Sequence, residues 1–274
     1  MNDLILQVKN LTVYLKKSKK CILSDVCFEL KKGDVLGIDG KNGCGKTTLL
    51  KIIYGLTNDY DIKSGEIYFY PFSNKNILSF NQRELLEYRQ SIAYVKQKDD
   101  YDGLNKLNIL DLIEDAISDI KGAELNRYVE LFNVCFPQTK DQSITLKSKP
   151  NNLSGGEQRM LSIFLGLVCR KQSNLMIIDE PLNNLDFENV MKISDLINEI
   201  KINNPWAAIL MITHCKIITC INRQRKIVDG KMECKDSKYE CHHCMGEPDC
   251  ENFYLKRKNN LTTLRTDTKF TKMF

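Results

Sequence analysis

The residues with the clearest chemical meaning form a glycine-rich segment from Gly40 to Thr47, with the sequence Gly-Lys-Asn-Gly-Cys-Gly-Lys-Thr. Its spacing matches G-x-x-x-x-G-K-[ST], and it lies between an apolar segment typical of a strand and one with helical periodicity. Such glycines let backbone N–H groups turn around phosphate oxygens, and the start of the helix adds partial positive charge. Lys46 would neutralise the β- and γ-phosphates and Thr47 would bind Mg²⁺. This context favours a nucleoside triphosphate site over an incidental glycine-rich turn.

A second chemical signal is an apolar run, Leu175 to Ile178, that ends in the carboxylates Asp179 and Glu180. Taken alone, this pattern indicates a buried strand with a charged end. In a chain that also has a phosphate loop, we expect Asp179 to hold Mg²⁺ and Glu180 to accept a proton from attacking water. Neighbouring strand residues point to opposite faces, but at the end of a strand the second one can turn toward the γ-phosphate.

Between these two segments lies the sequence Leu-Ser-Gly-Gly-Glu-Gln, residues 153–158. Ser154 and Glu157 have the spacing of a capping box, which starts a helix. Gly155 and Gly156 would let an anion approach the unprotected N–H groups of that helix. An ordinary helix cap would produce the same local pattern, so this segment alone does not decide between the two interpretations.

In this order, the three segments resemble the ATP-binding cassette (ABC) ATPases, whose signature reads LSGGQ with variants such as LSGGE. The similarity covers about residues 4–232. It implies an α/β fold: a P-loop NTPase (RecA-like) core with an N-terminal antiparallel β subdomain and an inserted α-helical signature subdomain at about 98–158. We therefore expect an ATPase domain over 1–232 and treat 233–274 as an appendage.

The resemblance also implies roles for individual residues. Tyr14 is similar to the aromatic residue that stacks on adenine, although cross-strand packing is nearly as compatible with its position. Gln97 resembles the glutamine that touches Mg²⁺ or water, residues 181–186 resemble the D-loop, and His214 resembles the switch histidine, although a lone His after a strand is more often structural. The implied nucleotide contacts are Tyr14, Gly40, Asn42, Gly43, Cys44, Gly45, Lys46, Thr47, Thr48, Ser154, Gly155, Gly156 and Asp186; the Mg²⁺ contacts are Thr47, Gln97 and Asp179; the catalytic residues are Gln97, Glu180 and His214.

Four residues differ from the family pattern or could add chemistry to it. Asp39 stands where the family has an apolar or small residue, and it would weaken phosphate binding unless its carboxylate points away. Asn183 and Asn184 replace small D-loop residues, which leaves their contacts open. Cys44 lies near a helix N-terminus, where a thiol pKa tends to fall, so its modification would block nucleotide binding. The simpler interpretation is that a small residue fits the loop.

These residues need a scaffold that brings strand ends together. We expect strands over 4–15, 21–30, 34–39, 66–70, 91–95, 175–179 and 207–213, and helices over 45–56, 109–120, 157–170 and 189–202. Their alternation indicates a largely parallel sheet covered by helices. The polar segment 137–152 is interpreted as a connection.

The composition is that of an ordinary globular protein. The chain has 274 residues, a net charge of +5, 27% charged and 42% hydrophobic residues. A weakly basic balance does not indicate a nucleic-acid partner, no apolar stretch is long enough for a membrane span, and the N-terminus lacks a secretory pattern. These features lead us to expect a cytoplasmic protein.

In this family, the signature completes the nucleotide site of a second subunit. The resemblance therefore implies a head-to-tail dimer, with itself or a closely related subunit, that closes on ATP and drives separate membrane permease subunits from the inner face of the membrane. The alternative is a soluble ABC ATPase that acts in metallocluster assembly or on nucleic acid.

The last part of the chain is rich in cysteine. Cys234, Cys241, Cys244 and Cys250 fall in a short polar segment with two histidines, and four soft ligands could hold tetrahedral Zn²⁺. The spacing does not fit a standard zinc finger, so a reduced, metal-free tail is an equal alternative, and an iron–sulfur cluster is a weaker one.

Overall fold

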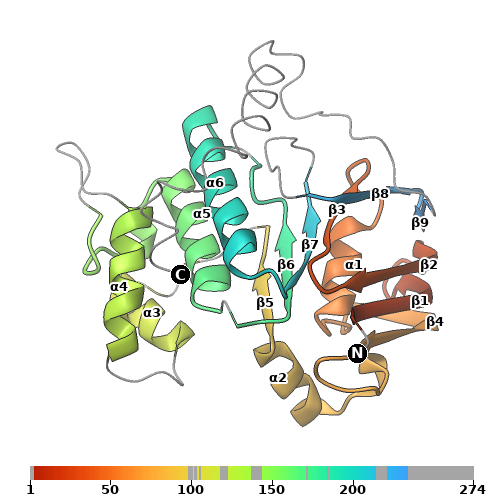
Figure 1. Cartoon of the computed structure of the whole chain (residues 1–274). Helices are drawn as coiled ribbons and strands as arrows, with labels where there is room; N and C mark the ends of the chain where they lie inside the picture. Colours follow the sequence, from red (N-terminus) through yellow and green to blue (C-terminus); the bar gives the residue numbers. More distant parts are fainter. Residues whose placement is uncertain are drawn as a thin grey trace.

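The computed structural model describes residues 3–97, 101, 104, 106–117, 123–136, 144–170, 172–183, 185–213 and 221–233. Within these residues the chain forms two sheets with helices packed between and beside them (Figure 1). The smaller sheet is antiparallel with the order β2-β1-β4, and the larger has the order β5-β6-β7-β3-β8-β9. The strands are β1 (Leu4–Leu15), β2 (Cys21–Lys31), β3 (Val35–Asp39), β4 (Tyr60–Phe69), β5 (Ile92–Val95), β6 (Leu175–Asp179), β7 (Ala208–Ile212), β8 (Arg223–Val228) and β9 (Lys231–Met232).

The larger sheet is parallel from β5 to β8, and only β9 runs antiparallel, against β8. Its strands are short and fully buried in β3, β6 and β7, as expected for a sheet covered on both faces. Because side chains alternate along a strand, Met176 and Ile178 of β6 join one core, whereas Leu175 and Ile177 join the other. The same alternation turns Asp179 toward the face that holds Leu175 and Ile177.

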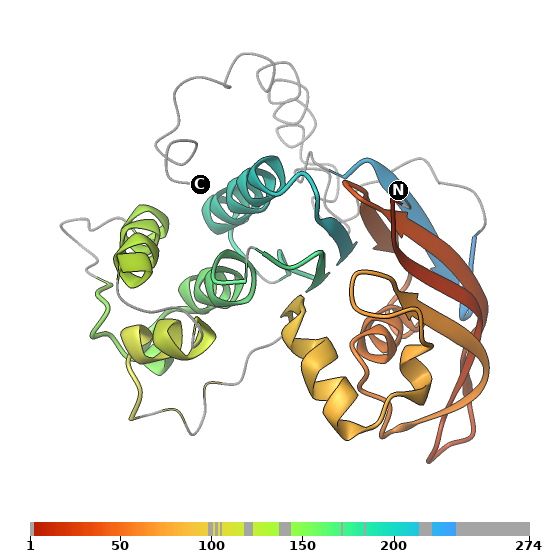
Figure 2. The ribbon, with the colours of Figure 1, turned by 60° about the horizontal axis from the view of Figure 1, so that its bottom comes forward.

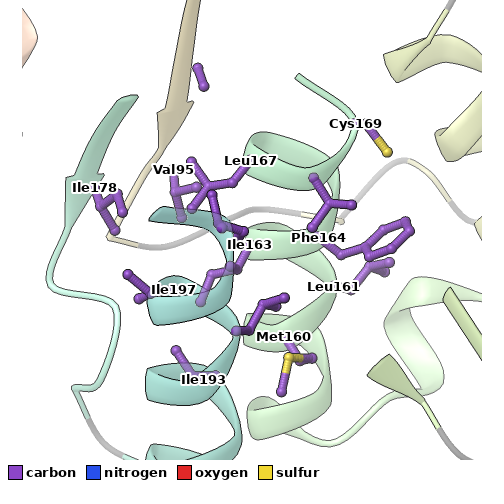
Figure 3. Packing of buried hydrophobic residues seen from close by; sticks show 14 of the residues in the cluster. Val95, Met160, Leu161, Ile163, Phe164, Leu167, Cys169, Ile178, Ile193 and Ile197 are labelled. Carbon is purple, nitrogen blue, oxygen red and sulfur yellow. The ribbon is translucent and has the colours of Figure 1, made fainter. Parts of the chain in front are cut away.

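That face is covered by α1 (Lys46–Ile53), which packs with the antiparallel sheet in one hydrophobic core. The opposite face is covered by α5 (Gly155–Ile163) and α6 (Phe187–Asn203). Figure 3 shows Ile193 and Ile197 of α6 beside α5, with Val95 of β5 and Ile178 of β6 above them in this view. The helix α5 continues into a π-helical turn, η3 (Phe164–Val168), where Gly166 lies so close to β5 that an added Cβ would be 2.7 Å from Val95 Cγ2.

Further helices complete the described part. They are η1 (Ile77–Ser79), α2 (Gln82–Gln90), α3 (Ile109–Ala116), α4 (Ala123–Cys135) and η2 (Pro150–Asn152). In Figures 1 and 2, α3 and α4 lie on the side of α5 that faces away from the antiparallel sheet. Capping boxes begin both α2 and α3, through Asn81 with Glu84 and Asn108 with Asp111.

The expected fold class is confirmed, including the antiparallel N-terminal sheet and the largely parallel core. Several boundaries differ: β4 begins at Tyr60 rather than at residue 66, and α5 begins at Gly155 rather than at residue 157. The sequence patterns missed α2, α4, β8 and β9. No helix in the described part of the chain has both the length and the apolar character needed to cross a lipid bilayer.

Candidate active site

The phosphate loop connects β3 to α1 as the motif predicts. Gly40 has φ +147°, and a Cβ there would lie 2.4 Å from the carbonyl oxygen of Ile227. Gly45 has φ +110°, and its Cβ would lie 2.8 Å from the carbonyl oxygen of Ile22. Only glycine fits at these two positions. Since Gly45 caps α1 without a side-chain hydrogen bond, the first turn of α1 presents its N–H groups to an anion.

Lys46 and Asp39 lie at the base of this loop. The Lys46 side chain is only 4% exposed, and its Nζ donates to the carbonyl oxygens of Gly40 at 2.5 Å and Lys41 at 3.2 Å. The Asp39 carboxylate accepts the Gly40 N–H at 2.6 Å, so one of its oxygens is engaged by the loop's own backbone. Asp39 therefore stabilises the start of the loop through this hydrogen bond.

Asp179 ends β6 beside α1. The Thr47 hydroxyl donates to Asp179 Oδ1 at 3.3 Å, and the Asp179 side chain is almost fully buried. Burial raises its pKa to about 6; the hydrogen bond from Thr47 opposes this shift, and the nearby Glu180 charge adds to it. A hydroxyl and a buried carboxylate next to the phosphate loop are hard oxygen donors that suit Mg²⁺. The residues present therefore fit the predicted metal.

Glu180 turns out of the strand direction, with φ +47° and its N–H bonded to the Ile212 carbonyl oxygen at 3.0 Å. Its Oε2 accepts hydrogen bonds from Gln97 Nε2 at 2.6 Å and from Asn183 Nδ2. The left-handed backbone is strained for a non-glycine residue and sets the direction of the side chain. The structure thus brings together Gln97 and Glu180, as predicted, and adds Asn183, whose role the sequence left open.

Arg159 is the residue near this site that the sequence analysis missed. It lies on α5, and its side chain is 8% exposed. Its guanidinium donates to the carbonyl oxygens of Asp179 at 2.8 Å, Pro181 at 3.1 Å and Lys96. Its role leaves no pattern in the sequence, because its acceptors are backbone atoms.

The predicted capping box is present at the start of α5. Ser154 caps the helix, its N–H bonds to Glu157 Oε2 at 2.7 Å, and the Glu157 N–H bonds to Ser154 Oγ. Gly155 has open space around it, with no atom within 4 Å of an added Cβ. Gly156 instead packs on the Asn189 side chain. In the described part of the chain, no hydrogen bond joins residues 154–156 to the phosphate loop.

Residues 23–183 match a family model described as ABC transporter. The chain belongs to the ABC transporter family. The lipoprotein-releasing system ATP-binding protein LolD of Buchnera aphidicola subsp. Schizaphis graminum is 31% identical over 220 residues, which cover 78% of this chain and 89% of that protein. LolD of Francisella tularensis subsp. tularensis (strain FSC 198) is 28% identical over 258 residues, with 85% and 97% covered.

A solved structure shows that the fold is shared. The ATP-binding cassette MJ0796, in a dimeric post-hydrolysis state bound to ADP and Pi, matches with a TM-score of 0.69 at 24% identity, covering 86% of this chain and 99% of that one. By its family and relatives, this chain is an ATP-binding, ATP-hydrolysing subunit of an ABC transporter.

The other predicted nucleotide contacts lie on several elements of the cassette. Tyr14 is half-buried on β1. The residue before it, Val13, pairs with Leu23 of β2, and the Leu23 side chain lies close to Gly45 of the phosphate loop. Asp186 caps α6 by accepting the Asn189 N–H at 2.8 Å, and this bond holds the pKa of Asp186 below its ordinary value. Asn42 and Gly43 are exposed, and Thr48 is half-buried on α1.

Cys44 differs from its expectation. Burial raises the pKa of its thiol, and the nearby Lys46 charge opposes this only in part. The expected lowering of this pKa was therefore wrong, because desolvation outweighs the helix terminus and the lysine. The Cys44 sulfur would lie 2.8 Å from a Cβ on Gly40, so the structure supports a small residue chosen for fit.

Some predicted residues lie outside the described residues. They are His214, Asn184 and the four cysteines of the appendage, Cys234, Cys241, Cys244 and Cys250.

Proposed function

We propose that this subunit binds ATP between its own phosphate loop and the signature segment, residues 153–158, of a second subunit. That subunit is another copy or a closely related ABC subunit. Hydrolysis then separates the two and drives transport through separate membrane permease subunits. The observation that carries this proposal is the Glu180 carboxylate, held by Gln97 and Asn183 beside the Thr47–Asp179 pair. A held carboxylate, a hydroxyl–carboxylate pair and the phosphate loop thus lie together at one sheet edge, which supports the proposed base, metal site and phosphate site.

In the proposed complex, Lys46, Thr48 and the first-turn N–H groups of α1 hold the phosphates, and Tyr14 stacks on the adenine. Thr47, Asp179 and Gln97 hold Mg²⁺, which supplies charge neutralisation at the β- and γ-phosphates. The hydrogen bond between Thr47 and Asp179 supports the first two of these metal contacts, because it brings their oxygens within 3.3 Å.

Glu180 acts as the general base in this proposal. Two amide donors hold its Oε2, and the described residues make no hydrogen bond to Oε1. We assign Oε1 to the proton of the attacking water, because a carboxylate fixed through one oxygen presents the other in a defined direction. His214 is proposed to face the γ-phosphate after β7.

The second subunit supplies Ser154, Gly155 and Gly156, with Asp186 at the adjoining D-loop. The open space at Gly155 supports this assignment, since the start of α5 is accessible to a ligand that the same chain does not contact. The charge of a γ-phosphate would then bind the N-terminus of α5.

The test is the substitution Glu180→Gln, with the exposed Glu66→Gln as a matched control. We expect the Glu180 variant to bind ATP, to hydrolyse it very slowly and to elute as a dimer with ATP but as a monomer with ADP in size-exclusion chromatography. A variant that stays monomeric and turns over at the normal rate would refute the role of Glu180.

The proposed location is the cytoplasmic face of a membrane, bound to permease subunits and without a nucleic-acid partner. The ABC transporter family model and the relatives named lipoprotein-releasing system ATP-binding protein support transport rather than the alternative in metallocluster assembly or nucleic-acid metabolism. Recovery of the native protein with a polytopic partner in the membrane fraction tests this location, and recovery only in the soluble fraction would contradict it.

The domain boundaries are proposed from the sequence pattern. We propose the boundary between the ATPase domain and the appendage at residues 232 and 233, and a helical subdomain at about 98–158, which contains α3 and α4.

One Zn²⁺ bound by Cys234, Cys241, Cys244 and Cys250 would appear as one equivalent in elemental analysis. Absence of metal from anaerobically purified protein would contradict the zinc site and support a reduced, metal-free tail.

A further inference from the structure

Arg159 makes contacts that reach both catalytic side chains through the backbone. Two of its acceptors, the carbonyl oxygens of Asp179 and Pro181, belong to the residues on either side of Glu180. Its third acceptor is the carbonyl oxygen of Lys96, the residue before Gln97. One side chain therefore holds the ends of β5 and β6 beside the catalytic residues that follow these strands.

The burial of this arginine makes the contacts strong. Because Arg159 is only 8% exposed, its guanidinium has lost most of its water and must be satisfied by fixed acceptors. The planar fork of arginine reaches several carbonyls at once in a fixed geometry, which an ammonium group cannot do. The three carbonyl oxygens are thus held relative to one another and to α5.

The helix that carries Arg159 also carries the signature. Ser154 caps α5 five residues earlier, which corresponds to about 7.5 Å along a helix. The capping box and the packing of Gly156 against Asn189 hold this first turn in place. The Ser154 cap and Arg159 are therefore joined by one continuous helix.

We propose that Arg159 is a positioning residue for hydrolysis, which ties the signature helix to Glu180 and Gln97 of the same chain. This inference rests on the proposed function, in which the Ser154 cap contacts the nucleotide of the second subunit. Nucleotide bound at one composite site is then linked, through α5 and Arg159, to the geometry of the carboxylate at the other. Arg159 itself touches no nucleotide.

The first test compares Arg159→Met and Arg159→Lys with the control Arg89→Met. Arg89 also donates to two backbone carbonyl oxygens, those of Tyr54 and Gly55, but at the far end of α1. We expect Arg159→Met to lower kcat about 10- to 100-fold with KM for ATP changed less than twofold, because a small misplacement of a reacting group is costly. Arg159→Lys should recover part of kcat, and Arg89→Met should lose stability while keeping kcat.

The second test measures single-turnover hydrolysis in Glu180→Gln with and without Arg159→Met. If Arg159 acts through Glu180, the second substitution should add less than a twofold loss to the first. Multiplicative losses, or a normal kcat in Arg159→Met, would overturn the inference while the Glu180 assignment stands. A normal rate in Glu180→Gln alone would overturn both. If Arg159→Met does not fold, Arg159→Lys carries both measurements, and wild-type kcat in that folded variant overturns the proposal.

Discussion

Gln97 and Glu180 are 83 residues apart in the sequence, and their side chains are joined by a hydrogen bond of 2.6 Å. The contact exists because β5 and β6 are parallel neighbours, whose carboxyl ends meet at one edge of the sheet. The amide of Gln97 therefore fixes the rotamer of the Glu180 carboxylate.

Replacing Gln97 by Ala tests this relationship. Loss of one donor to the Glu180 carboxylate, together with a proposed metal contact, should lower kcat about 10- to 100-fold. The Gln90→Ala control removes an exposed amide at the end of α2 and should leave kcat unchanged. Steady-state ATPase assays at saturating Mg²⁺ measure both variants, and equal rates for the two would contradict the role of Gln97.

Asn183 allows a test of how the base is held. Asn183→Ala removes the amide that bonds to Glu180 Oε2, and Asn183→Asp keeps the size of the side chain but replaces the donor by an acceptor. Because the carboxylate then has one donor fewer, kcat should fall about 10-fold in both variants with little change in KM for ATP. Steady-state ATPase assays measure both constants. Wild-type kcat in both variants would show that Asn183 does not act on the base.

The raised pKa of Asp179 predicts a pH-dependent stability without metal. A folded-state pKa of about 6, above the ordinary 3.8, means that the contribution of Asp179 to stability is largest below pH 3.8 and is lost as the pH rises through 6. Asp179→Asn should therefore be more stable than the wild type in EDTA, by up to about 3 kcal/mol at pH 7.5 and about half of that at pH 5.

Chemical denaturation at the two pH values measures this difference. Asp59→Asn, at an exposed position, serves as the control and should show no such dependence. A gain for Asp179→Asn that is equal at both pH values would mean that burial of the carboxylate is not its cause.

Substitutions of two loop glycines distinguish the cost of close packing from the cost of backbone strain. Both Gly43 and Gly45 have positive φ, but only a Cβ on Gly45 would meet other atoms, at 2.8 Å from Ile22 O and Leu23 Cδ2. Gly43→Ala should lower the free energy of unfolding by about 1–2 kcal/mol, the cost of a left-handed backbone. Gly45→Ala should lower the free energy of unfolding by more. Circular dichroism melts in which Gly43→Ala is the less stable of the two variants would contradict the close packing at Gly45.

The motifs predicted the parts of the site whose chemistry is local in sequence. The phosphate loop, the carboxylates at the end of β6 and the Ser154 cap all depend on residues within one short segment, and their types restrict what they can do. The strand β8 was missed because its residues Arg223 to Lys226 are polar, although its backbone pairs with β3 in the core sheet.

The parts of the site that the motifs did not predict depend on contacts between distant segments. Arg159 bonds to backbone carbonyls, which every residue carries, so the identities of Lys96 and Pro181 give no signal. The position of Asn183 beside Glu180 depends on the left-handed backbone of Glu180, which no side-chain pattern predicts.

The shared nucleotide site is tested most directly by mixing two inactive variants. Lys46→Ala removes the phosphate-binding ammonium, and Gly155→Glu places a negative charge in the open space at the signature. Each variant alone should be inactive. Mixed in equal amounts, they should recover about a quarter of the wild-type rate, because half of the dimers carry one intact composite site. An inactive mixture, with heterodimers shown to form, would contradict a site shared between two chains.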